Sequence, residues 1–85
     1  GLTMNLDGID AAVADVAALL RLDGADLELV NADPRIDRVD VRLVLDRVEC
    51  LDCVLPPDQL RSTIEQALHA RAPGEYELRV DDPRR

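Results

Sequence analysis

The fold of this 85-residue chain depends on one stretch, Val48-Glu49-Cys50-Leu51-Asp52-Cys53-Val54-Leu55-Pro56-Pro57. Before it, apolar residues alternate with polar ones, which is typical of a β-strand with one buried face. After it, apolar residues recur every three or four positions, which indicates an amphipathic helix with proline at its start. The stretch also holds both cysteines. It therefore places two thiols at a strand-to-helix corner.

Two strands are expected before this corner. Residues 39–46 alternate regularly, with every second side chain apolar. Residues 26–30 show the same alternation over a shorter length. Between them, Asn31-Ala32-Asp33-Pro34 has the composition of a turn. Two strands joined by a short turn predict an antiparallel hairpin.

Two amphipathic helices flank the hairpin. Apolar residues at helical spacing predict a first helix over about residues 8–22, with capping oxygens at Asn5 and a stop at Gly24. The second helix is expected to open at Pro56 and to end before Pro73. Each helix has one apolar stripe, so each needs a partner surface to cover it.

A third strand over residues 76–80 and a polar tail over 82–85 complete the chain. Because every strand has one apolar face, the simplest burial is a two-layer arrangement. The sequence therefore predicts an α+β fold of order α-β-β-α-β, with a three-stranded mixed sheet and two helices on one face. A chain of this length is expected to form a single domain, 1–85.

The charge balance excludes several classes of partner. The formal net charge is −8, from 18 acidic residues against ten arginines and no lysine. Such a surface repels phosphate backbones and anionic lipids, so neither nucleic acid nor a membrane is expected as a partner. With no long apolar run and no leader pattern, neither a transmembrane span nor a signal peptide is expected. The expected compartment is the cytoplasm, where two cysteines would stay reduced.

Two segments carry a resemblance to a known family. The first, Leu19–Val30, joins a helix end to a strand start through Asp23-Gly24-Ala25-Asp26. The second has, in order, Cys50, Cys53, Leu60-Arg61, Ile64-Glu65, Leu68 and Pro73. Together these segments resemble the C-terminal domain of NifU-type iron–sulfur proteins, which has Asp-Gly-Gly-Asp at the first place. At the second it has Cys-x-x-Cys followed by Leu-Lys, Ile-Glu, Leu and Pro.

The resemblance implies an iron–sulfur cluster carrier or scaffold, not an enzyme, with Cys50 and Cys53 as the ligands of the metal. A cluster of the 4Fe-4S type takes four thiolates and one chain has two, so two chains would share one cluster as a homodimer. His69 would lie too far along the second helix to complete the site. The implied partner is an apo iron–sulfur acceptor protein.

The residues around the thiols favour an alternative. The family has small residues before its first cysteine, where this chain has Val48-Glu49, and hydroxyl residues after the second, where it has Val54-Leu55-Pro56-Pro57. Glu49 and Asp52 add negative charge beside an anionic cluster, and prolines lack the N–H that could bond to its sulfurs. The alternative is a metal-free acidic accessory module, or a small subunit of a larger complex, that keeps the fold without a cofactor.

Three other roles for the thiol pair remain open. The cysteines could be small apolar core residues at a corner, could bind zinc, or could cycle as a dithiol. Dithiol chemistry is disfavoured because acidic neighbours raise a thiol pKa, no aromatic residue precedes the pair, and a βαβ context is not indicated.

Overall fold

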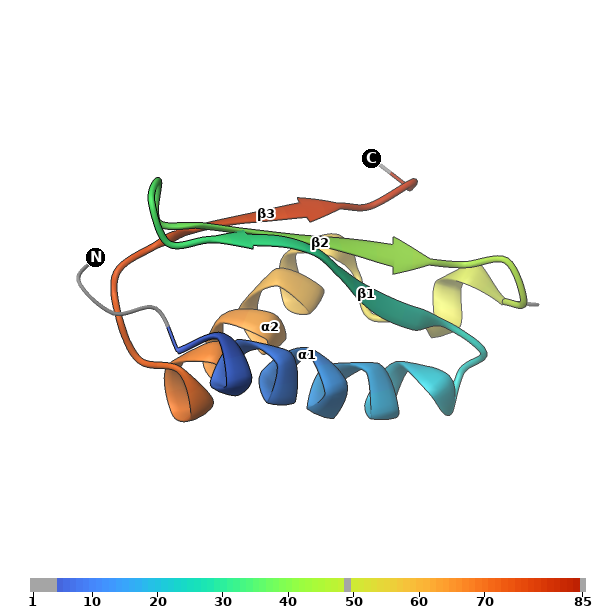
Figure 1. Ribbon diagram of the computed structural model, residues 1–85. Coiled ribbons are helices and arrows are strands. Elements are labelled where there is room, and N and C mark those ends of the chain that lie inside the picture. The colour runs from blue at the N-terminus through green and yellow to red at the C-terminus, as the bar shows by residue number, and fades with distance from the viewer. Residues whose placement is uncertain (1–4, 49, 85) are drawn as a thin grey trace.

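The computed structural model describes residues 5–48 and 50–84 and has the expected order of helices and strands. The elements are α1 (Leu6–Arg21), β1 (Asp26–Asp33), β2 (Arg38–Val44), the short 3₁₀ helix η1 (Leu51–Cys53), α2 (Pro57–Arg71) and β3 (Glu77–Asp81). The three strands form one mixed sheet, and both helices cover the same face of it (Figure 1). The two-layer α+β fold is therefore confirmed.

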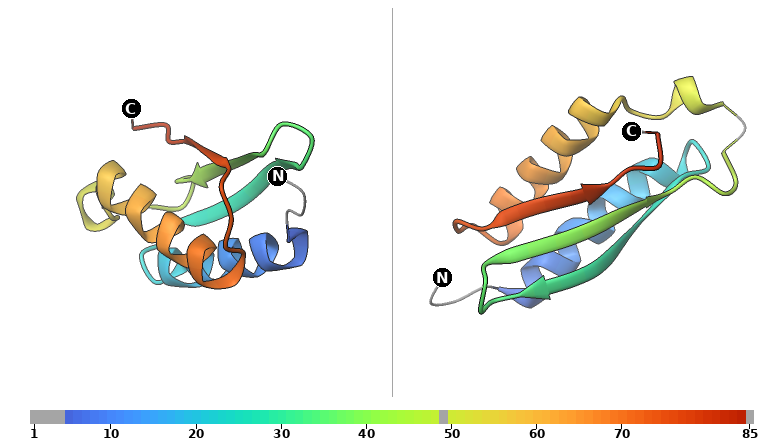
Figure 2. Two further views of the ribbon diagram at one scale, coloured as in Figure 1. Left: turned by 90° about the vertical axis from the view of Figure 1, so that its left-hand side faces the viewer. Right: turned by 90° about the horizontal axis from the view of Figure 1, so that it is seen from above.

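β2 is the central strand of the sheet (Figure 2). It pairs antiparallel with β1, where Leu27 faces Leu43, and parallel with β3, where Val39 faces Leu78. Since α2 connects the two parallel strands, β2, α2 and β3 form a βαβ unit. The expectation that the cysteines lack a βαβ context is wrong, because they lie in the connection from β2 to α2.

The core between the two layers is aliphatic. The inward face of β2 contributes Val39, Val41 and Leu43, each at most 2% exposed. α1 and α2 cover this face with their apolar stripes, among them Ile9, Val16, Leu20, Leu60, Ile64 and Leu68. Within the helices and strands, the buried positions follow the period of each element, as the hydrophobic pattern predicts. Neither helix in the described parts of the chain is long and apolar enough to cross a membrane.

Glycine at position 8 allows α1 and α2 to approach each other closely. α1 begins at Leu6, earlier than expected, because the Asn5 side chain accepts a hydrogen bond of 2.9 Å from the Gly8 N–H. A Cβ atom on Gly8 would overlap the carbonyl oxygen of Arg71 at the end of α2. The absence of a side chain there therefore sets the spacing of the two helices at this end.

The hairpin turn lies later in the chain than expected. β1 continues through Asn31, Ala32 and Asp33, and the turn comprises residues 34–37, where Asp37 has a φ of 51°. The register of β1 against β2 skips Val30, so a β-bulge shifts the alternation of the strand at that point. This shift brings Ala32 onto the inward face. The turn predicted at 31–34 from its residue composition is wrong, because the bulge lets β1 continue its pairing with β2 through these turn-type residues as far as Asp33.

The polar tail is part of the folded structure. The Asp82 side chain is 1% exposed and accepts hydrogen bonds from the backbone N–H of Arg84 at 2.9 Å and from its Nη2 at 2.7 Å. These bonds raise the pKa of the Arg84 guanidinium above its ordinary value. Because a buried carboxylate needs such partners, the turn holds the end of the described chain against the sheet.

Candidate functional site

The two cysteines lie in a loop at one end of the molecule. We call residues 45–56, which connect β2 to α2, the cysteine loop. The molecule measures 42 × 21 × 18 Å, and η1, which contains Cys53, lies at one end of its long axis in Figure 1 and in the right-hand view of Figure 2. Glu49, expected to flank the thiols, lies outside the described residues. The loop therefore presents the cysteine pair at a tip of the fold.

Apolar side chains anchor both ends of the cysteine loop. Val54, directly after the second cysteine, is 2% exposed and belongs to the core. Val48 and Leu55 are half-buried and pack against the same core. The turn between the cysteines is closed by a hydrogen bond of 3.1 Å from the Cys53 N–H to the Cys50 carbonyl. The pair thus lies in a short loop whose two ends are anchored in the core.

Gly24 supports the loop from a distant part of the sequence. It follows α1 with a φ of +84°, and a Cβ atom there would lie 2.9 Å from the Arg47 carbonyl oxygen. The junction after α1 and the start of the cysteine loop are therefore in direct contact. Sequence analysis gave Gly24 a role in ending the helix only, because nothing in the periodicity indicates this contact.

Cys50 and Cys53 are both exposed and are joined by a disulfide, with their Cα atoms 5.3 Å apart. The proposal that they are small apolar core residues is therefore wrong. The oxidised pair also differs from the reduced pair expected in the cytoplasm. A disulfide closing so few residues constrains the unfolded chain little. The pair is therefore accessible enough to react, and its disulfide contributes little to the stability of the fold.

The described residues of a single chain offer the thiol pair no further ligand. Among residues 5–48 and 50–84, no three side chains of His, Cys, Asp or Glu are grouped so that they could hold a metal ion. His69 is exposed in the last turn of α2, which is about 18 Å along the helix from Pro57 at 1.5 Å per residue. With the ligands that the described residues offer, a metal centre with four protein ligands at this tip would need thiolates from a second molecule.

The tip of the molecule is acidic. Between residues 45 and 58 the sequence carries four carboxylates against one arginine, a balance of −3. Asp46, Asp52 and Asp58 are exposed, and in the described parts of the chain no arginine pairs with them. Elsewhere several arginines form ion pairs with carboxylates, as Arg42 does with Glu28 across the hairpin. The thiol pair therefore lies in a region of negative potential.

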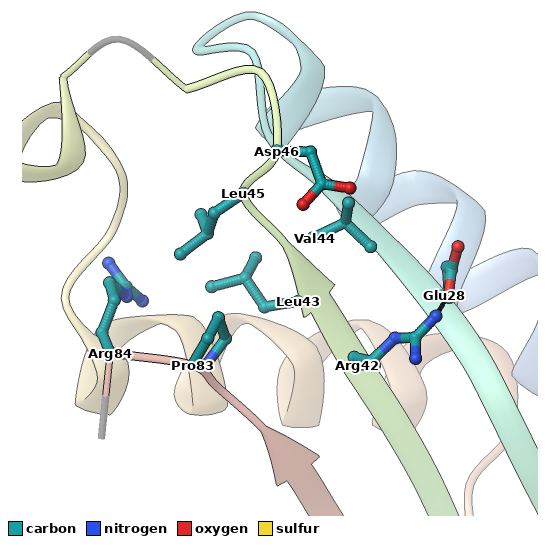
Figure 3. Close-up of a pocket in the computed structure, with 8 residues that line it drawn as sticks. All are labelled: Glu28, Arg42, Leu43, Val44, Leu45, Asp46, Pro83 and Arg84. Atoms are coloured by element: carbon teal, nitrogen blue, oxygen red, sulfur yellow. Dashed lines mark hydrogen bonds and ion pairs between the residues drawn. The ribbon is translucent and has the colours of Figure 1, made fainter.

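A groove of about 770 Å³ lies beside the start of the cysteine loop. Figure 3 shows Leu43, Leu45 and Pro83 around one space, with Arg84 beside it. The groove exists because β3 pairs with β2 only as far as Arg42, which leaves the last residues of β2 without a neighbour on that side. No cysteine lines the groove. Sequence analysis did not find it, since the tail that forms one wall was predicted to be a polar extension.

Comparisons of the chain with protein-family models, with curated proteins and with solved structures give no match. Function must therefore be argued from the tip and its thiol pair.

Proposed function

We propose that this chain carries an iron–sulfur cluster, which the reduced thiolates of Cys50 and Cys53 bind together with the same pair from a second copy. The observation that carries the proposal is the exposed cysteine pair at the tip of the fold, with no group of three potential metal ligands among the residues that the structure describes. The cluster is cargo, passed to an acceptor protein when the acceptor's thiolates replace those of the carrier one by one. The chain is then a carrier and not an enzyme.

Three properties of the tip support this proposal. Thiolates bind iron in clusters, and four of them complete a common site. The pair lies at the end of the long axis, so two copies can meet there with little contact between the rest of their surfaces. The contact between Gly24 and Arg47 packs the first segment that resembles NifU-type C-terminal domains against the loop that leads to Cys50.

The acidic tip makes the bound cluster easy to release. Two copies would bring Asp52 twice to the neighbourhood of an anionic cluster. At a separation of about 6 Å and an effective dielectric of 40 to 80, each like-charge pair costs about 1 kcal/mol. Weak retention suits a carrier, which must give the cluster to an acceptor protein. The cytoplasm is the proposed compartment.

Anaerobic reconstitution tests the proposal. The reduced chain is incubated with ferrous iron and sulfide, and visible charge-transfer absorbance, iron content and mass by light scattering are measured. We expect coloured dimers with one cluster per two chains, and colourless monomers for Cys50→Ser and Cys53→Ser. His69→Ala, which alters an exposed potential ligand on α2, is the matched control and should load normally. A reduced wild-type chain that stays colourless and monomeric would refute the proposal.

The second candidate is a metal-free acidic interaction module. The observation that favours it is the anchoring of the cysteine loop by Val48, Val54 and Leu55, which fixes the loop without any metal. Replacing both cysteines by serine separates the two candidates. A carrier loses iron binding and dimerisation, whereas a module keeps its stability, its oligomeric state and its partner.

A further inference from the structure

The Cys50–Cys53 disulfide has the features of a bond that is made and broken. Its Cα–Cα distance of 5.3 Å falls in the ordinary range for disulfides, and both residues are exposed to an attacking thiolate. It lies outside the core, and Val54 holds the loop on one side without it. On the other side the contact of Gly24 with Arg47 holds the loop. Opening the bond therefore leaves the fold intact.

Disulfide and cluster compete for the same two sulfur atoms. A sulfur atom in a disulfide carries no negative charge, and thiolates are the ligands that iron–sulfur clusters require. In the cytoplasm, the compartment expected from the sequence, disulfides are usually transient and belong to catalytic or redox-sensing sites. The oxidised pair seen here therefore corresponds to a form that cannot bind a cluster.

We infer that Cys50 and Cys53 form a reversible disulfide that a dithiol partner protein with a positively charged surface reduces, which makes the pair competent for the cluster. This regulation rests on the proposed carrier function, whereas the exchange reaction itself does not. The βαβ position of the pair, in the connection from β2 to α2, matches the place where dithiol–disulfide motifs occur.

The exchange needs a dithiol and no other reactant. One thiolate of the partner attacks a sulfur atom of the pair, forms a mixed disulfide and releases the other cysteine as a thiolate. The partner's second thiolate then attacks the partner's sulfur atom in the mixed disulfide, which releases the second cysteine of this chain as a thiolate. Two electrons pass to this chain, which gains two thiolates, and the partner leaves as a disulfide. The thiolates take up protons from water or bind the cluster.

The charge at the tip selects the partner. Asp52 lies between the two cysteines in the sequence, and Asp46 and Asp58 lie on either side of the pair, with no arginine bound to them in the parts of the chain described. An anionic thiolate approaching this tip is repelled, whereas positive charge on the partner offsets the repulsion. A basic dithiol protein is therefore favoured over an acidic one or over free glutathione.

Reduction rates measured on the oxidised chain test this selectivity. Cysteamine, mercaptoethanol and mercaptoethanesulfonate provide cationic, neutral and anionic thiols, and rates are compared per thiolate by trapping freed cysteines with a maleimide mass tag. We expect cysteamine to be fastest and the sulfonate slowest, with the differences shrinking in high salt. Asp52→Asn should speed the sulfonate reaction about twofold to fivefold. Equal rates for all three thiols, or an inert disulfide, overturn the inference.

Asp10→Asn is the matched control for Asp52→Asn. Asp10 is exposed in the first turns of α1, at the end of the molecule away from η1 (Figure 1). The substitution Asp10→Asn removes the same charge from the chain without changing the surroundings of the disulfide. The three rates should stay within the error of the wild-type values. A change as large as that of Asp52→Asn would show that only net charge matters, which overturns selection at the tip.

Iron uptake by the oxidised and reduced chains separates this inference from the proposed function. We expect iron and sulfide to load only the reduced chain, and reoxidation of the apo form to abolish loading reversibly. Equal loading of both forms overturns the inference and leaves the carrier function standing. Failure of both forms to load, with thiol exchange as predicted, overturns the carrier function and the regulation of cluster binding, but not the exchange.

Discussion

Gly24 connects the end of α1 with the loop that carries the thiols. Its φ of +84° is costly for residues with a side chain, and a Cβ atom would meet the Arg47 carbonyl oxygen at 2.9 Å. We therefore expect Gly24→Ala to lower the free energy of unfolding by about 1–3 kcal/mol, measured by urea denaturation with circular dichroism.

Gly24→Asn separates the two causes of this loss, because asparagine tolerates a positive φ but still carries the Cβ atom. A smaller loss than for alanine would assign the cost mainly to the backbone conformation, and an equal loss to the contact with Arg47. Wild-type stability of Gly24→Ala would contradict the close contact that supports the cysteine loop.

Tyr76, the one aromatic residue of the chain, gives a pH prediction with a direct optical readout. Partial burial raises the pKa of its phenol above 10.0, and the hydroxyl donates a hydrogen bond of 2.8 Å to the Ala72 carbonyl. Because the folded chain holds this proton more tightly, its contribution to stability is fully present below the unfolded pKa. It is lost as the pH rises through the folded value.

Absorbance titration in the ultraviolet therefore should show a higher midpoint for the native chain than for the chain in guanidinium. Stability measured by urea denaturation should fall over the same alkaline range, and Tyr76→Phe should remove this part of the fall. Coinciding midpoints in the two states would contradict the burial of the phenol.

At the scale of elements, the cysteine loop depends on Val54 for its anchor in the core. Val54 is 2% exposed, so Val54→Ala leaves unfilled space beneath the loop and should cost about 1–3 kcal/mol. Val30→Ala is the matched control, since Val30 is 59% exposed at the bulge of β1 and its replacement should change stability by no more than about 0.5 kcal/mol. Equal losses for both variants would mean that Val54 does not anchor the loop.

The period of apolar residues was enough to predict both α-helices and all three strands, but neither their limits nor the short 3₁₀ helix η1. Leu27, Val39 and Leu60 lie inside because each element buries the stripe that its period defines. The predicted limits were wrong where a bulge or a helix cap, neither of which follows the apolar period, shifted or extended an element. Val30 shifts the strand by one residue, and Asn5 caps α1 earlier than its apolar stripe begins.

Contacts between distant segments were beyond prediction for a different reason. The sequence left open whether Cys50 and Cys53 are buried or exposed, because two thiols at a corner suit the core and the surface equally well. The support of the loop by Gly24 and the burial of Asp82 arise when separate segments meet in the folded chain. A glycine or an aspartate of the kind found in many turns does not, in the sequence alone, indicate which distant segment it contacts.

For the whole molecule, charge opposes the proposed dimer. Each copy carries a net charge of −8, and dimerisation at the acidic tips brings the two charges together. Because added salt screens such repulsion, with a Debye length of about 30 Å at 0.01 M and 8 Å at 0.15 M, the cluster-bridged dimer should be tighter at the higher salt concentration. Analytical ultracentrifugation of the loaded chain measures this. Chelation of the iron should return monomers at either salt concentration, and a dimer that weakens with salt would contradict tip-to-tip association.

The central position of β2 has a consequence for synthesis of the chain. β2 is hydrogen-bonded to both other strands, but its parallel partner β3 comes almost forty residues later, as the pairing of Val39 with Leu78 shows. A nascent chain can therefore form the hairpin early, but cannot complete the sheet until residues 77–81 have left the ribosome. During that interval the cysteine loop belongs to a chain whose sheet is incomplete, so Cys50 and Cys53 can react with oxidants or iron before the chain has folded completely.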